Sequence, residues 1–143
     1  MPVIGFGFTS FEAKKGKSSI TGEIKVNSTP KILNVREVTM NPFEKKALTF
    51  DFDFTTTYAP DVAEIKVGGE LLYLAEPAKN NQILKKWKKD KKLPDELSAE
   101  ILNHLFRRCL IKISNMAEDL QLPPPIALPR VSPKKSEEPS YVG

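Results

Sequence analysis

The sequence predicts an α+β protein in which an antiparallel sheet of four to five strands packs on one long C-terminal helix. From Val3 to Ala75, apolar residues recur with a period of two, which is typical of strands that bury one face. After Ala75 the period becomes that of an amphipathic helix. Because the strands precede the helices and do not alternate with them, the pattern favours an antiparallel sheet over a parallel one.

The strand signal is strongest at 48–54, where Leu-Thr-Phe-Asp-Phe-Asp-Phe alternates without a break. The phenylalanines of this run belong to the core face, and its aspartates belong to the polar face. Phe6 and Phe8 alternate with glycine, and weaker alternation runs over 20–26 and 31–40. We therefore expect separate strands in each of these stretches.

A further strand is expected at 62–74, where the pair Gly68-Gly69 indicates a bulge or a bend. Stretches rich in glycine, proline, asparagine and serine separate the strands, and each is short enough to join antiparallel neighbours. The expected turns lie at 15–19, 27–30, 41–45 and 58–61.

Two helices are expected after the sheet. A short basic helix covers about 78–89, Leu93-Pro94 breaks it, and the main helix then runs to about Leu120. The apolar residues of the main helix fall on two adjacent rows. The first row holds Leu97, Ile101, Leu105, Cys109, Ile113, Met116 and Leu120, and the second holds Leu102, Phe106, Leu110 and Ala117.

The main helix has two interpretations. At about 1.5 Å per residue it is about 40 Å long, which is longer than a small sheet would cover. It either packs entirely within its own domain or buries part of its apolar face against a second copy of the chain. In the second case we expect a homodimer or homotetramer whose subunit interface contains Leu102, Phe106 and Leu110.

The positive charge that gives the chain its net charge of +4 is concentrated at 79–92, a segment with seven lysines and one acidic residue. One interpretation is a solvated basic helix with Trp87 turned inward. The other is a ribosome- or RNA-associated protein that contacts phosphates through this segment. The residues of that second hypothesis are Lys85, Lys86, Trp87, Lys88, Lys89, Lys91 and Lys92.

The sequence argues against an enzyme. Asp51 and Asp53 lie on the polar face of a strand, where exposure to solvent accounts for two aspartates without a catalytic role. His104 and Cys109 are five residues apart on one helix, about 140° around its axis, and cannot form a dyad within the chain. One cysteine and one histidine do not make a zinc site alone, so no metal or other cofactor is expected.

The location expected from the sequence is the cytoplasm. The N-terminus has no basic region before its apolar residues, and no run reaches the ~18 apolar residues of a membrane span. A single cysteine excludes an internal disulfide. We expect one domain over 1–131 and a mobile, proline- and charge-rich tail over 132–143.

Three segments carry a resemblance to a known family. Residues 62–74 resemble the last strand of the SecB-type protein-export chaperones, including its internal Gly-Gly. Residues 105–111, Leu-Phe-Arg-Arg-Cys-Leu-Ile, are similar to that family's mid-helix segment. Residues 122–131, Leu-Pro-Pro-Pro-Ile-Ala-Leu-Pro-Arg-Val, resemble its helix-connecting loop. Each motif is short, and their order and spacing make the case.

The resemblance implies a holdase that binds unfolded or nascent polypeptides without ATP, in partly aromatic grooves of a dimer of dimers. The connecting loop borders that groove, so Ile126, Leu128 and Val131 are its matching peptide-binding candidates. Weaker candidates are Phe6, Phe8 and Phe11 on the first strand. Prolines would hold the loop extended and leave its apolar side chains available for contact.

Two departures from the family are visible. A second helix and an acidic tail that contacts an export motor should follow the loop, but twelve residues rich in proline and charge follow Val131. The family is usually acidic, whereas this chain is basic. These departures favour a divergent, archaeal-like member, or a SecB-like fold that acts on another partner, and they leave a role in protein transport open.

Overall fold

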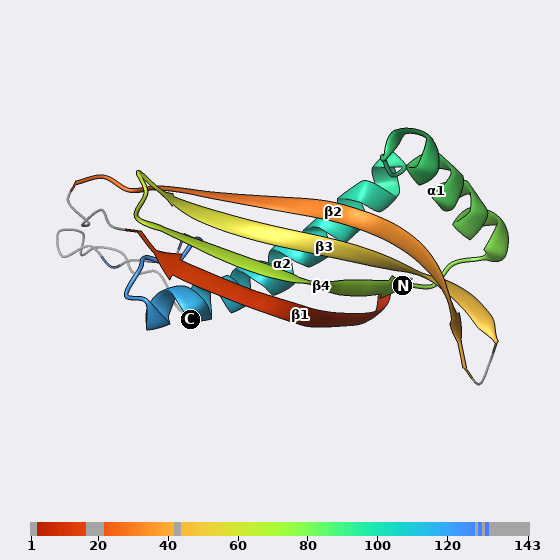
Figure 1. The fold of residues 1–143 in the computed structure, drawn as a ribbon, viewed down its shortest axis with the longest axis horizontal. Coiled ribbons are helices and arrows are strands. Elements are labelled where there is room, and N and C mark those ends of the chain that lie inside the picture. The colour runs from red at the N-terminus through yellow and green to blue at the C-terminus, as the bar shows by residue number, and fades with distance from the viewer. Residues whose placement is uncertain (1–2, 17–21, 42–43, 128, 130, 132–143) are drawn as a thin grey trace.

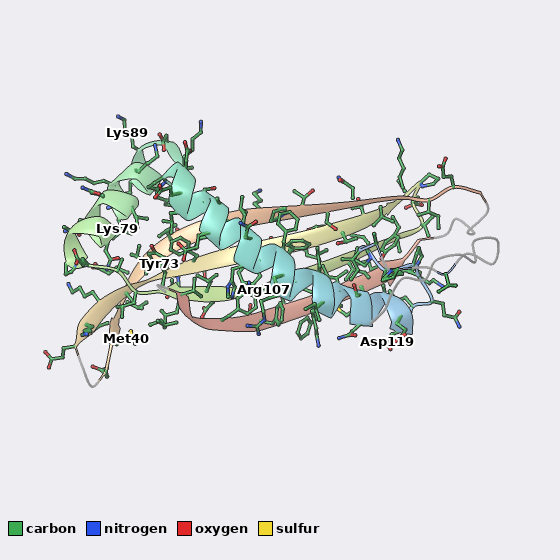
Figure 2. The ribbon with its side chains drawn as sticks, turned by 180° about the vertical axis from the view of Figure 1, so that it is seen from behind. Met40, Tyr73, Lys79, Lys89, Arg107 and Asp119 are labelled. Atoms are coloured by element: carbon green, nitrogen blue, oxygen red, sulfur yellow. The ribbon has the colours of Figure 1, made fainter. Side chains whose placement is uncertain are left out.

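A computed structural model describes residues 3–16, 22–41, 44–127, 129 and 131. Four strands form one antiparallel sheet in the order β1-β4-β3-β2. The strands are β1 (Val3–Lys15), β2 (Lys25–Met40), β3 (Lys45–Ala59) and β4 (Ala63–Tyr73). Two helices follow, α1 (Pro77–Asp90) and α2 (Asp95–Asp119), and both lie on the same side of the sheet (Figures 1 and 2). The predicted fold class is confirmed, and the tail expected at 132–143 lies outside the described residues.

The predicted hairpins at 41–45 and 58–61 are confirmed, since β2 pairs with β3 and β3 pairs with β4. The hairpin predicted at 15–19 is wrong. β1 pairs with β4 at one edge of the sheet, while β2 forms the opposite edge, so these two strands are not neighbours (Figure 1). Turn-forming residues indicate where a strand ends but carry no information about which strand comes alongside.

The turn predicted at 27–30 is also wrong, because β2 runs through it as one strand of 16 residues. Pro30 pairs with Phe54, and Ser28 donates or accepts a hydrogen bond with Thr56 at 2.8 Å. An edge strand tolerates a proline because the missing N–H can lie on the side without a neighbouring strand. The two strands expected at 20–26 and 31–40 are therefore parts of one longer region, of which β2 begins at Lys25.

The glycine pair in β4 allows β1 to approach closely, but the bulge predicted within 62–74 is wrong, because Gly68 and Gly69 pair with β3 without a register shift and the irregularity lies in the neighbouring strand. The register shifts between Phe8 and Ser10, opposite Gly69 and Gly68, so the extra residue lies in β1. A Cβ atom on Gly69 would collide with the backbone carbonyl of Gly7. Both glycines are buried between the strands.

The core lies between the sheet and α2. The alternating phenylalanines Phe50, Phe52 and Phe54 of β3 are almost completely buried, as predicted. The sheet-facing row of α2 is equally buried, and from Leu97 to Ile113 it is the row predicted from helical spacing. Its C-terminal end was predicted wrongly, because Ala117 of the second row is buried while Met116 and Leu120 are only half-buried. This row consists of Leu97, Ile101, Leu105, Cys109, Ile113 and Ala117.

The opposite face of the sheet is polar, and neither described helix covers it (Figure 1). Arg36 of β2 donates hydrogen bonds to Asp51 of β3 at 2.8 and 2.9 Å, and to Glu70 of β4 at 3.1 Å. Lys66 lies 3.5 Å from Asp53 on the same face. The carboxylates that alternate with the core phenylalanines are thus used in ion pairs between neighbouring strands.

Candidate binding surface

The long helix α2 crosses the strands diagonally, so its two flanks border different edges of the sheet (Figure 2). At its N-terminal half, Leu102 lies beside Pro30 and Ile32 of β2. Further along, Arg108 and Lys112 reach the phenylalanines of β1. Arg108 and Lys112 each precede a residue of the sheet-facing row, whereas Leu102 follows one, so they point to opposite flanks of the helix. The two flanks therefore carry different kinds of side chain.

The β1 flank carries three phenylalanines, which we call the β1 aromatic row: Phe6, Phe8 and Phe11. Phe6 stacks on Phe52 with ring centroids 5.2 Å apart and contacts Phe8 edge-on at 5.1 Å. Phe8 and Phe11 lie 5.3 Å apart. Phe6 and Phe8 are half-buried, and Phe11 is 49% exposed. The row therefore extends the apolar core to the surface along an edge strand.

Two cations of α2 lie over this row. The guanidinium carbon of Arg108 is 4.5 Å from the ring centre of Phe6, and Nζ of Lys112 is 4.6 Å from that of Phe11. Both distances are those of cation–π contacts, in which the ring face attracts the positive charge. Neither residue was predicted from the sequence. Their spacing of four places them on one flank of the helix, but the sequence does not reveal that β1 lies under that flank.

His104 packs at the same place, with its ring centre 5.2 Å from that of Phe6. Burial lowers its pKa, and the charges of Arg107 and Arg108 lower it further, against a smaller opposite effect of Glu100. Its Nδ1 lies 3.2 Å from Nη2 of Arg107. The imidazole is therefore neutral at pH 7, and the positive charge next to Phe6 comes from arginine.

The proline segment after α2 is anchored beside the C-terminal end of β3. Leu122 is buried, and the hydroxyl of Tyr58 donates a 2.6 Å hydrogen bond to the carbonyl of Pro123. Ile126 is half-buried and Val131 is almost fully exposed, while Leu128 lies outside the described residues. The structure thus places the start of this loop, at Pro123, near the turn between β3 and β4, whereas the β1 aromatic row lies along α2.

The β2 flank of α2 is apolar and lies over the middle of the sheet. Phe106 meets Phe54 edge-on at 5.4 Å and is 36% exposed, while Leu102 and Leu110 are half-buried. This row is more exposed than the sheet-facing row, and its role as a subunit interface stays a prediction. The length argument for that interface was wrong, because β3 has 15 residues, about 50 Å, and is longer than the helix of 25 residues, about 38 Å.

The basic segment forms the predicted helix, α1, and its lysines are exposed. The proposed stacking role of Trp87 is wrong, because this side chain is 7% exposed and packs in the core with Ile83 and Leu93. Only its outer surface meets a cation, with Nζ of Lys91 5.6 Å from the ring centre. Exposed lysines alone are the usual surface of a solvated helix, so the RNA hypothesis gains no support.

Among the described residues, no three histidine, cysteine or carboxylate side chains come together as a metal-binding cluster. Burial raises the pKa of the Cys109 thiol to about 12, so it stays protonated and unreactive at neutral pH. The carboxylate of Asp51 is hydrogen-bonded to Arg36, and this bond raises the pKa of the guanidinium. No helix in the described part of the chain is long and apolar enough to cross a membrane.

Comparisons with known proteins bear on this geometry. No family model and no curated protein sequence matches the chain. Among solved structures, it is similar to a SecB-like chaperone of Mycobacterium tuberculosis, determined in complex with a ChAD peptide from the HigA1 antitoxin. The match has a TM-score of 0.60 at 12% sequence identity and covers 93% of this chain and 91% of that one. The fold predicted from the three short motifs is confirmed.

Proposed function

We propose that this protein, whose chain has the SecB-like fold, is a chaperone that binds non-native polypeptide segments without a nucleotide. The observation that carries the proposal is the β1 aromatic row. It is a continuous apolar surface that begins in the core at Phe52 and reaches solvent at Phe11, along the edge of the sheet. Aromatic side chains at the surface offer large contact area for apolar segments of another chain.

The edge position of β1 favours an extended partner. β1 pairs with β4 on one side, and no described strand pairs with its other side. An extended segment laid along such an edge can bond to the main chain and place alternate side chains against the row. The similarity to a chaperone that was solved with a bound peptide supports the same class of partner.

The test is suppression of aggregation of an unfolded client at near-stoichiometric amounts of the chaperone, without ATP. We expect the protein to suppress aggregation and Phe11→Ser to weaken this effect with the fold intact, since Phe11 is 49% exposed. The matched control is Leu33→Ser, because Leu33 is 46% exposed but lies on β2 at the other edge. Unchanged client aggregation with the wild-type protein would contradict the proposal.

The loop candidates form a separate part of the proposed surface. Ile126→Asp tests whether the segment after α2 takes part in client binding, because Ile126 is half-buried and follows the anchor at Pro123. If the loop contributes, this variant weakens suppression as Phe11→Ser does. If it matches the wild-type protein, client binding is confined to the β1 aromatic row.

We also propose that the protein self-associates through the β2 flank of α2, where Phe106 and its neighbours are partly exposed. Ile111, one position beyond Leu110, is 59% exposed and extends this apolar surface. A charge at Phe106 should give a folded but smaller species, because the sheet-facing row is untouched. Sedimentation equilibrium measures this, and a wild-type mass of 16.0 kDa at micromolar concentration would contradict self-association.

A further inference from the structure

We propose that the β1 aromatic row selects segments in which acidic residues accompany the aromatic or aliphatic ones. This inference rests on the proposed function and specifies the chemistry of the client. Arg108 and Lys112 lie directly over the row, at 4.5 and 4.6 Å from the ring centres of Phe6 and Phe11. A client segment that lies along the row therefore has a positive charge near each end of the apolar surface that it contacts.

The two cations have no carboxylate partner among the described residues. The ion pairs formed by the described residues use other cations and lie elsewhere in the structure. Those cations are Arg36, Lys46, Lys66 and Lys86. A guanidinium and an ammonium group next to an apolar surface, without an anion, are available to a carboxylate of a bound segment.

The acidic side chains nearby do not neutralise this surface. Glu12 follows Phe11 in β1 and points to the opposite face of the sheet, where its register partner is Lys66. Glu100 lies two turns before Arg108 on α2, and no ion pair among the described residues joins it to Arg108 or Lys112. The two cations over the row are thus not paired with an acid of the described residues.

The spacing of the two cations fits an extended chain. Residues four apart on a helix are separated by about 6 Å along its axis. Alternate residues of a strand are separated by about 6.6 Å and point to the same side. Acidic residues at positions i and i+2 of an extended client could therefore meet Arg108 and Lys112 together, with apolar residues next to them on the phenylalanine rings.

The experiment compares three labelled peptides with the same apolar residues, in which the intervening positions are all glutamate, all glutamine or all lysine. Fluorescence anisotropy at low salt gives their affinities for the full-length protein. We expect the glutamate peptide to bind roughly 2- to 10-fold more tightly than the glutamine peptide, the range of one or two exposed charge pairs. The lysine peptide should bind most weakly, and 0.5 M salt should reduce the difference.

The double variant Arg108→Gln and Lys112→Gln should bring the glutamate peptide to the affinity of the glutamine peptide. The matched control is the double variant Lys85→Gln and Lys89→Gln, which removes the same charge from exposed positions on α1. It should leave the preference unchanged, which separates a local effect from the net charge of the protein.

The outcomes separate this inference from the proposed function. If none of the peptides binds and client aggregation is unchanged, the proposed function fails, and the inference fails with it. If the glutamine or lysine peptide binds as tightly as the glutamate peptide, the selection for acidic segments is wrong while the chaperone function stands. If the α1 variant abolishes the preference as well, long-range charge and not the β1 aromatic row causes it.

Discussion

The two faces of the sheet are made by the same strands but are stabilised in different ways. On the covered face, Phe50, Phe52 and Phe54 are excluded from solvent by α2. On the open face, the residues between them are polar, and Arg36 joins Asp51 to Glu70 across three strands. The β1 aromatic row is where the covered face extends to the edge of the sheet and becomes accessible. A candidate binding surface can thus arise where aromatic residues that continue the core are only partly covered by the helix.

Phe52→Ala should have the largest effect, because it removes a side chain that is 1% exposed and stacks on Phe6. We expect a loss of about 3–5 kcal/mol in the free energy of unfolding, from lost burial and the cavity left behind. Urea denaturation followed by circular dichroism measures it. A loss below about 1 kcal/mol would mean that the covered face does not carry the stability of the fold.

Gly69→Ala tests the close approach of β1 and β4. Its Cβ atom would collide with the backbone of Gly7, and overpacking of this kind costs about 1–3 kcal/mol. The matched control is Gly7→Ala, because a Cβ atom at Gly7 meets no atom within 4 Å. We expect a lower urea midpoint only for Gly69→Ala, together with weaker client binding, since β1 carries the aromatic row. Equal midpoints for the two variants would contradict the close approach.

Tyr58→Phe removes the hydroxyl that holds the loop at Pro123 but keeps the buried ring. We expect a loss of about 1 kcal/mol in the free energy of unfolding, the usual contribution of one hydrogen bond. Hydrogen exchange should rise in the segment from Leu122 to Ala127 more than in the sheet. Unchanged exchange there would show that Leu122 anchors the loop without this bond.

Arg36→Gln should have the smallest effect, because its side chain is 42% exposed and water screens its ion pairs. The expected loss is about 0.2–1 kcal/mol, and it should shrink further at high salt. Urea midpoints of the variant and the wild-type protein at low salt and in 1 M salt measure this. A loss as large as that for Phe52→Ala would contradict the division of roles between the two faces.

Much of the fold follows from local patterns. The alternation at 48–54 identified Phe50, Phe52 and Phe54 as core and Asp51 as polar, because the two faces of a strand are set by its geometry alone. The helical spacing in α2 identified the buried row from Leu97 to Ile113 in the same way. By contrast, the hairpins predicted at 15–19 and 27–30 were wrong. β1 and β2 lie at opposite edges of the sheet, and residues 27–30 lie within β2.

The candidate binding surface was predictable only in part. The resemblance pointed to Phe6, Phe8 and Phe11, and the structure brings these rings together with Phe52. Their cationic neighbours were not predictable, because contacts between β1 and α2 join residues about one hundred positions apart. The burial of Trp87 was one of two interpretations of the same lysine-rich helix, and only packing against the core decides between them.

The sequence by itself determined the α+β class, the long helix, and which residues of β3 and α2 face the core. These features depend on repeats of two and 3.6 residues, which act over a few neighbours and need no knowledge of the rest of the chain. Only the tertiary structure decided the strand order, which places β1 beside β4, and the diagonal path of α2, which brings Arg108 and Lys112 over Phe6 and Phe11. Such features are set by the packing of whole elements against one another, where the lowest free energy depends on all of their contacts together.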